Sequence, residues 1–499
     1  MKSSQKVRTF SRGIWLLAIF STVAFAGEDN SLSATELIEK ATLQEHVLIG
    51  NVAAPDDPGA PAERRFLNYL SAGSEIGRIN FGADLTTMMT EFQNTGVDRL
   101  VSLEKKHVSY VGDDLRADLG DSTQLLGRGI ALDLYRDDVF GIYNTLEGLS
   151  ARYDASFAKI SGFAGRVNAL VAPVALNPIE YPLTDRQMML AGGVAELNAF
   201  EGSRLGLHAF TAQQMTTDNT ESWAWNTVGA VVAQDNVLEG IDVYLEPNIV
   251  LRDHSLFGKN SALSPSFGTF VSIAMSPDQW KIKLEAKDYR NYDFGFRRPP
   301  TLEDELIASL NNEDVSLARF QAERRVGPLA LTASVAAGYD RVIRTQIYHG
   351  IIGSRFHWGR DELELKAGYR LMPGDNDITH AAVKFKVGTF AGQSLEMNLR
   401  RQLEAHRIST TPFNNDRNLV EATYNFSERW SLGLGFENVP TNPASLGADF
   451  FNANIAYKAG AKSARAFLGS TSGGARCSGG VCRVVPPFSG ALLEGYYSF

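Results

Sequence analysis

Cysteine, positive charge and long apolar runs are all scarce in this sequence. Its 499 residues include two cysteines, too few for a disulfide-rich scaffold or a multi-cysteine metal site. Lys and Arg number 48 against 57 Asp and Glu, a net charge of −9, whereas nucleic-acid-binding proteins usually carry a basic excess. After the first 26 residues, the sequence contains no run of 18 uncharged apolar residues. We therefore predict a mature chain that crosses no membrane as a helix and binds no nucleic acid.

Sequence signatures of enzymes are missing as well. The chain has no Gly-x-Ser-x-Gly motif and no glycine-rich phosphate loop, and none of its 8 histidines forms a His-x-x-x-His pair. We therefore predict that the protein is not an enzyme and binds no metal and no cofactor. A Ser/His or Asp/His pair that is assembled only in space would leave no such signature, and this alternative stays open.

The N-terminus has the three parts of a secretory signal peptide. A basic segment ends at Arg12, an apolar run spans residues 14–25, and Ala24 and Ala26 supply the small residues of a cleavage site. The apolar run is shorter than the roughly 20 residues of a spanning helix, which disfavours a membrane anchor. Cleavage after Ala26 removes four basic residues and no acidic one. The mature chain then has 44 basic and 57 acidic residues, a net charge of −13.

Apolar and polar side chains alternate at the C-terminus and in many segments before it. The last ten residues end on Phe499 and resemble the final strand of bacterial outer-membrane barrels, whose terminal aromatic residue is recognised by the barrel assembly machinery. The same two-residue period recurs at 280–287, 362–371, 383–387, 395–400, 420–426 and 451–458. This alternation is typical of strands with one face toward lipid and the other toward a lumen.

Short and long connections also alternate along the chain. Residues 326–328 and 358–360 are short turns, whereas 291–315 and 471–489 are long connections. Outer-membrane barrels combine short periplasmic turns with long extracellular loops, and a soluble β-sandwich or propeller has no reason to keep this alternation. We predict an all-β fold with a single transmembrane antiparallel β-barrel over residues 76–499. The count is about 18–22 strands, with about nineteen of them from Ile142 onward.

Residues 27–75 do not alternate. Ser33 and Glu36 fit a capping box that starts a short helix ending near His46, and a Pro-rich linker follows at 53–61. We predict that this segment lies in the periplasm or folds into the lumen. It is too short to be the plug of an energy-coupled receptor.

Two other stretches interrupt the barrel pattern. In residues 119–132, Gly127 and Gly129 flank Arg128, so either the backbone bends inward and places Arg128 across the pore, or a strand is twisted by a glycine bulge. In the connection 291–315, Thr301 caps a short acidic helix over residues 301–310, which forms either a surface lid or an inserted constriction.

These stretches carry a resemblance to a known family. The run Leu-Gly-Asp…Gly-Arg-Gly-Ile-Ala-Leu at 119–132 and the Pro-Pro-Thr-Leu of 299–302 are similar to an uncharacterised family of large Gram-negative outer-membrane β-barrel proteins. The resemblance implies a barrel in the cell outer membrane, in contact with outer-membrane lipid and lipopolysaccharide. It implies no activity, because none is assigned to the family.

The two cysteines lie close together in the last long connection. Cys477 and Cys482 are separated by four residues that include Gly479 and Gly480, and an exported protein meets an oxidising compartment. We predict a local disulfide that fixes a loop tip. A redox-active or metal-binding thiol pair is the alternative, although a metal would need further ligands and no histidine is nearby in sequence.

The predicted lumen face is basic over one part of the barrel. The candidate pore-lining residues are Arg128, Lys281, Lys283, Lys287, Lys366, Arg370, Lys384, Lys386 and Arg400. Such a wall suits a passive pore or channel for small polar solutes. An equal alternative is that these charges pair across strands and fill a closed barrel. The alternative function is a structural or assembly component of the outer membrane that binds a periplasmic or surface partner.

Overall fold

The computed structural model describes most of the chain. The described residues are 41–52, 63–92, 96–134, 136–137, 142–171, 187–215, 223–253, 265–292, 300, 302, 314–342, 344–373, 376–389, 392–406, 416–439, 449–460, 462–472, 474–478, 481–485 and 488–498. Within these ranges, no helix is long and apolar enough to cross a membrane.

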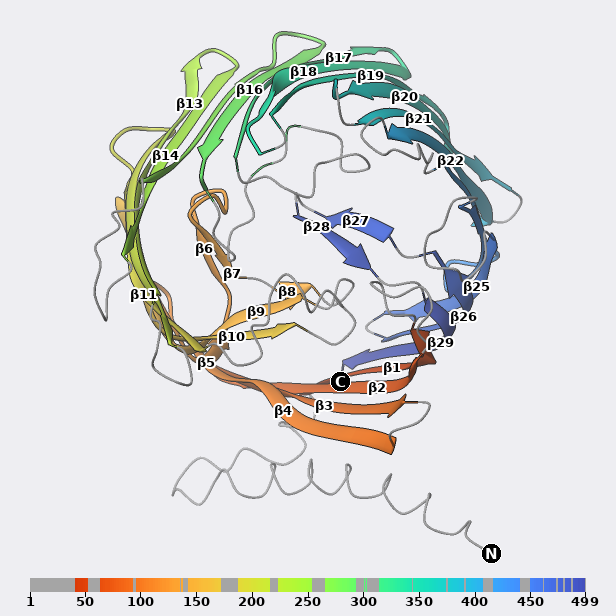
Figure 1. Ribbon diagram of the computed structural model, residues 1–499, viewed down its shortest axis with the longest axis horizontal. Helices are drawn as coiled ribbons and strands as arrows, with labels where there is room; N and C mark the ends of the chain where they lie inside the picture. The colour runs from red at the N-terminus through yellow and green to blue at the C-terminus, as the bar shows by residue number, and fades with distance from the viewer. Residues whose placement is uncertain are drawn as a thin grey trace, which may run out of the picture.

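Twenty-four antiparallel strands form a closed ring (Figure 1). Strand β1 closes it, because β1 pairs with β2 on one side and with β29 on the other. The ring strands are β1 (Ala41–Val52), β2 (Glu63–Ile76), β3 (Ile79–Phe92), β4 (Gly96–Val111), β5 (Leu115–Ser122), β9 (Ile142–Asp154), β10 (Ala158–Val171), β11 (Gln187–Leu197), β12 (Ser203–Met215), β13 (Trp223–Leu238), β14 (Ile241–Asp253), β15 (Ser266–Met275), β16 (Trp280–Arg290), β17 (Val315–Val326), β18 (Leu329–Asp340), β19 (Thr345–Trp358), β20 (Asp361–Leu371), β21 (Asn376–Gly388), β22 (Ser394–His406), β23 (Arg417–Asn425), β24 (Trp430–Asn438), β25 (Asp449–Ala459), β26 (Lys462–Thr471) and β29 (Phe488–Ser498).

The remaining strands lie outside this ring order. Strand β8 (Arg136–Asp137) pairs with β9 alone. Two hairpins form separate sheets, β6 (Gln124–Leu126) with β7 (Leu132–Leu134), and β27 (Gly474–Ser478) with β28 (Val481–Val485). All four hairpin strands belong to connections between ring strands.

Side chains alternate across the wall of the ring. On β12, Leu205 and Leu207 are exposed, whereas His208 and Phe210 are buried. The exposed set on other strands is rich in Leu, Val, Ile, Phe and Tyr, and therefore the outer surface is apolar. A closed ring leaves no unpaired strand edge, so a barrel with this surface can stand in lipid without unsatisfied backbone groups.

The connections differ in length between the two ends of the ring. At one end, all eleven connections between consecutive ring strands are two to five residues long, such as 327–328 and 359–360. At the other end the longest connection between ring strands is 291–314. The β6–β7 hairpin belongs to the connection between β5 and β9 at that same end. The predicted fold class and the alternation of connection lengths are confirmed.

Three predictions that depend on the N-terminal part are wrong. The ring has 24 strands rather than 18–22, and the whole difference comes from β1 and β2. The nineteen strands expected from Ile142 onward are present, and β3, β4 and β5 complete the upper count of 22. The barrel therefore begins at Ala41 and not at residue 76, and His46 lies in a strand and not in a helix. The signal peptide, Ser33 and the linker at 53–61 lie outside the described residues.

The apolar core lies inside the ring. One buried cluster joins the β6–β7 hairpin to β9–β12, and a second joins Ile130 at the hairpin tip to β13–β19. The hairpin thus packs on a continuous part of the inner wall.

Candidate pore constriction

The β6–β7 hairpin turns inward from the wall. Figure 1 shows it inside the ring, apart from the neighbouring strands β5 and β9. Its register pairs Gln124 with Leu134 and Leu126 with Leu132, and the tip is closed by the amide of Gly129, which donates to the carbonyl oxygen of Leu126 at 3.2 Å. Of the two interpretations of residues 119–132, the inward bend is therefore the one observed.

Leucine side chains anchor the hairpin. Leu126, Leu132 and Leu134 are each at most 2% exposed and pack against Phe163, Phe210 and neighbouring apolar residues of the wall. Burying one leucine contributes about 1.5–3 kcal/mol. Three such side chains hold the hairpin in one place, although its two strands form a sheet separate from that of the ring.

The hairpin tip is also held by a buried carboxylate. Glu246 of β14 is 0% exposed, and its Oε2 accepts a hydrogen bond from the backbone amide of Arg128 at 2.8 Å. The hydroxyl of Tyr244 donates to the same oxygen at 2.5 Å, and Asn248 Nδ2 donates to Oε1 at 3.3 Å. Burying a carboxylate destabilises a protein unless the carboxylate accepts hydrogen bonds. Glu246 therefore needs these donors, and the hairpin amide needs Glu246 as its acceptor.

Glycine is required beside this carboxylate. Gly127 has a φ of +60°, which side chains rarely adopt, and a Cβ there would lie 2.1 Å from Glu246 Oε1. A substitution would therefore meet both backbone strain and a clash.

The side chain of Arg128 remains at the edge of the apolar cluster. Its Cζ atom lies 4.0 Å from the centre of the Tyr244 ring and 5.4 Å from that of Phe270, while the residue as a whole stays exposed. Stacking on an aromatic face orients the guanidinium without removing it from water. Arg128 is thus a cationic group carried on the inserted hairpin.

The polar contacts continue along the inner wall to β12. Asn248 Oδ1 lies 2.6 Å from Nε2 of His208, which is 2% exposed, and a Cβ on Gly229 would lie 2.0 Å from Asn248 Oδ1. A chain of contacts therefore runs from the hairpin amide through Glu246 and Asn248 to His208.

Two other long connections reach the inner face. Leu302, in the 291–314 connection, is 1% exposed and belongs to the buried cluster that contains Tyr289 and Tyr292. The amide of Ser472 donates to Glu437 Oε2 at 3.3 Å, and Arg417 Nη2 donates to Ser472 Oγ at 3.1 Å. Leu302 thus lies inward, as expected of a constriction and not of a surface lid. The rest of the predicted helix at 301–310 lies outside the described residues.

The predicted basic wall lies on β16, β20, β21 and β22. Alternation places its lysines and arginines on the face opposite exposed residues such as Leu284 and Leu365. Lys287 and Arg370 are buried, whereas Lys366 is half-buried and Lys281, Lys386 and Arg400 are exposed.

Several of these charges pair with carboxylates of neighbouring residues. Lys283 Nζ lies 2.6 Å from Glu285 Oε1, and Lys384 Nζ lies 3.0 Å from Glu396 Oε1. Arg400 Nε donates to Asn398 Oδ1 at 3.2 Å. The alternative in which wall charges pair thus applies to Lys283 and Lys384.

Sequence reasoning missed two arginines of this wall. Arg319 binds Glu285, and Arg355 lies 3.4 Å from Glu362 and 3.2 Å from Glu364. The alternation of residues 315–321 and 350–357 is a signal that would have placed both arginines on the inner face.

The cysteines lie opposite each other in the β27–β28 hairpin. Cys477 and Cys482 are register partners in this antiparallel pair. Facing Cα atoms in such pairs are about 4.5–5.5 Å apart, within the range that a disulfide spans. The backbone is compatible with the predicted disulfide, which stays a prediction because the described part of these residues is the backbone alone. Elsewhere among the described residues, no group of three or more His, Cys, Asp or Glu is placed to hold a metal ion.

Comparisons with known proteins give one partial family match. Residues 381–499 match the model of DUF6029, a family of unknown function. A search of curated proteins found no match.

Solved structures with a similar course of the chain include three bacterial proteins. The translocation pore of the P pilus usher PapC is 10% identical and has a TM-score of 0.42, covering 92% of this chain and 100% of its own. The siderophore receptor PirA from Pseudomonas aeruginosa is 11% identical with a TM-score of 0.47, over 92% and 80%. A BenF-like porin from Pseudomonas fluorescens Pf-5 is 12% identical with a TM-score of 0.40, over 77% and 98%.

Proposed function

We propose that this protein is an outer-membrane β-barrel that provides a passive channel for small polar solutes, narrowed by the β6–β7 hairpin. The observation that carries the proposal is the hairpin held inside a ring of 24 strands by Glu246. Barrels of 16–18 strands already enclose an aqueous channel, and wider ones hold inserted segments. A ring of this width needs such a segment if it is to admit only small solutes.

The two faces of the wall support this proposal. The outer face is apolar, as contact with lipid requires, and the inner face carries paired and exposed charges from β16 to β22. Charged side chains around a water-filled path favour polar solutes over apolar ones. Exposed Lys281 and Lys386 on this face, together with Arg128 on the hairpin, favour anionic or zwitterionic solutes.

Ion conductance in a planar bilayer tests the proposal. Purified wild-type protein is compared with a variant in which residues 124–134 are replaced by a short Gly-Ser linker, after heat-modifiable gel mobility has established that both are folded. We expect discrete conductance steps from the wild type and larger steps from the variant. No current from either protein in several salts would contradict a channel and favour the structural or assembly role. Equal steps would contradict the hairpin as the constriction.

A further inference from the structure

An apolar hollow lies on the outer face of the barrel between β15 and β20. Its volume is about 810 Å³, and most of its lining residues, such as Leu284, Phe320 and Tyr348, point outward by alternation. The floor is made of small residues, namely Ala286, Ala318, Ala337 and Gly350, and a Cβ on Gly350 would meet no atom within 4 Å.

Larger side chains form the walls of this hollow. Leu284, Phe320, Tyr348 and Tyr369 are each 40–46% exposed. The register explains the depression, because Ala286 is opposite Ala318, Ala318 is opposite Ala337, and Gly350 is opposite Val335. Three neighbouring strands thus place their smallest side chains at one level.

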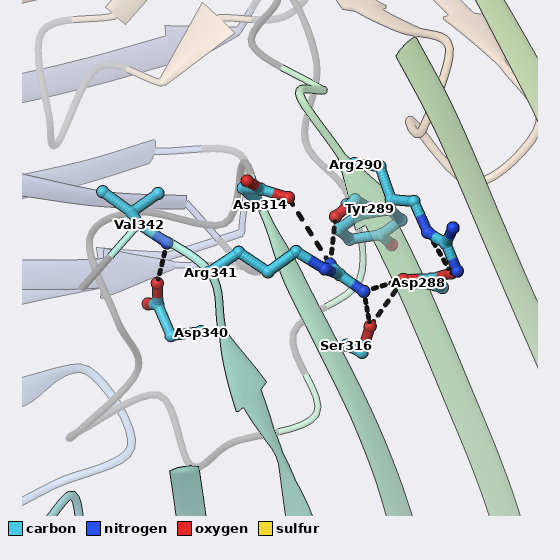
Figure 2. A network of polar contacts seen from close by, with 8 residues as sticks. All are labelled: Asp288, Tyr289, Arg290, Asp314, Ser316, Asp340, Arg341 and Val342. Carbon is cyan, nitrogen blue, oxygen red and sulfur yellow. Dashed lines mark hydrogen bonds and ion pairs between the residues drawn. The ribbon is translucent and has the colours of Figure 1, made fainter. Parts of the chain in front are cut away.

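A polar cluster borders the hollow toward the end with long connections (Figure 2). Asp288 lies two residues after Ala286 on β16, and Ser316 lies two residues before Ala318 on β17. Both therefore share the outward face of these alanines. Arg341 Nη2 lies 2.7 Å from Asp288 Oδ1, Ser316 Oγ donates to Asp288 Oδ1 at 2.5 Å, and Arg290 Nη2 lies 2.8 Å from Asp288 Oδ2. Figure 2 shows Arg341 reaching from the end of β18 to this carboxylate, with Arg290 on its other side.

Arg290 keeps donors available for a ligand. Its side chain is 59% exposed, and its contacts to Asp288 use Nε and Nη2. A guanidinium has five N–H groups, so the contacts to Asp288 leave the N–H groups of Nη1 for an anion. Arginine suits phosphate in particular, because its planar fork matches the phosphate oxygens.

We propose that this hollow and Arg290 together form a binding site for one phosphate-bearing lipid of the surrounding membrane, with an acyl chain in the hollow and the phosphate at Arg290. The inference rests on the membrane placement in the proposed function, since lipid is what covers the outer face of such a barrel. The apolar hollow with a charged group at one end has the two-part chemistry of an amphiphile, and Arg290 at that end complements the phosphate of a headgroup.

Native mass spectrometry of lipid retention tests the site. Folded protein in detergent is titrated with palmitoyl-oleoyl phosphatidylethanolamine and with the diacylglycerol that has the same chains. The variant Ala318→Leu with Gly350→Leu fills the hollow, Arg290→Gln removes the phosphate donor, and Ala209→Leu, outward on β12, is the matched control. Gel mobility verifies that each variant is folded.

We expect wild type and Ala209→Leu to retain one phospholipid that the filled variant loses. For Arg290→Gln, we expect about tenfold weaker phospholipid binding and no preference for phospholipid over diacylglycerol. The tenfold change corresponds to the loss of one hydrogen bond to a charged group. Equal retention by all variants would overturn the site, and so would a dimer of the wild type that the filled variant abolishes, because the hollow would then seat a second copy. The conductance of the filled variant separates the two proposals. An unchanged current with lost lipid in this variant supports both proposals. A wild type that retains lipid but carries no current contradicts the channel alone.

Discussion

At the scale of single residues, the account depends on a carboxylate that no water reaches. Glu246 is fully buried, and one of its hydrogen-bond donors is a backbone amide on a segment 118 residues away in the chain. The alternation of residues 241–246 favours an inner-face position for Glu246, and the pattern at 119–132 singles out Gly127, Arg128 and Gly129. The sequence could not pair them, because a contact over that separation depends on how far the hairpin bends inward.

Removing this carboxylate is expected to release the hairpin tip. Glu246→Ala leaves the Arg128 amide without its acceptor, at a cost of about 1.5–3 kcal/mol, and Glu246→Gln costs less because an amide oxygen can still accept. Hydrogen exchange followed by mass spectrometry should show faster exchange in residues 124–134 of Glu246→Ala. Glu364→Ala, which removes an inner-wall carboxylate bound to Arg355, should leave this exchange unchanged. Equal protection in all three variants would mean that Glu246 does not hold the hairpin.

Gly127 offers a second test at the same contact. In Gly127→Ala, a residue with a side chain must adopt a left-handed backbone conformation, which destabilises the protein by about 1–2 kcal/mol. The new Cβ would also clash with Glu246. Gly327→Ala is the matched control, since Gly327 has a similar φ of +58° and no atom within 4 Å of its Cβ position. We expect both variants to lose stability in urea titrations, and only Gly127→Ala to raise the open-channel current. A raised current in Gly327→Ala would attribute the effect to general loosening of the barrel.

At the scale of elements, strand alternation was the informative signal. It predicted the strands from β9 onward and the inner-face position of residues such as Lys366 and Lys384. It failed for β1 because residues 43–49 carry no clean two-residue period, and a local capping pattern at Ser33 suggested a helix instead. The ring nevertheless needs β1, because β2 and β29 would otherwise leave unpaired edges in lipid.

The charged wall makes a prediction about selectivity. Lys281→Glu with Lys386→Glu reverses two exposed charges, so the reversal potential under a salt gradient should shift toward cation preference. The shift should be clear near 0.1 M salt, where the Debye length is about 10 Å, and small near 1 M, where it is about 3 Å. The control Lys287→Gln changes a buried lysine and should leave the reversal potential unchanged. No shift in the double variant would show that this wall does not line the ion path.

At the scale of the whole molecule, one closed sheet accounts for the composition. Apolar residues alternate along the strands and cover the outer face, so the chain builds a membrane surface without any long apolar run. The charges that the sequence predicts for the lumen face are of two kinds. Some are exposed, such as Lys281, and others are paired, such as Lys283 with Glu285. Neither the number of strands nor this division could be taken from the sequence, because both depend on pairings between distant segments.

Closure of the sheet predicts resistance to unfolding in detergent. Every ring strand is hydrogen-bonded on both sides, so no strand can be removed without breaking two ladders. Unheated protein should therefore migrate on a gel differently from boiled protein. A single mobility before and after boiling would contradict the closed barrel.

The measurement that tests the central claim most directly is the size limit for solutes in a liposome-swelling assay. Wild-type protein and the variant with residues 124–134 replaced by a Gly-Ser linker are compared with uncharged sugars of increasing size. If the hairpin narrows an otherwise wide lumen, the wild type admits only the small sugars and the variant admits larger ones at higher rates. An identical size limit for both proteins would contradict the account.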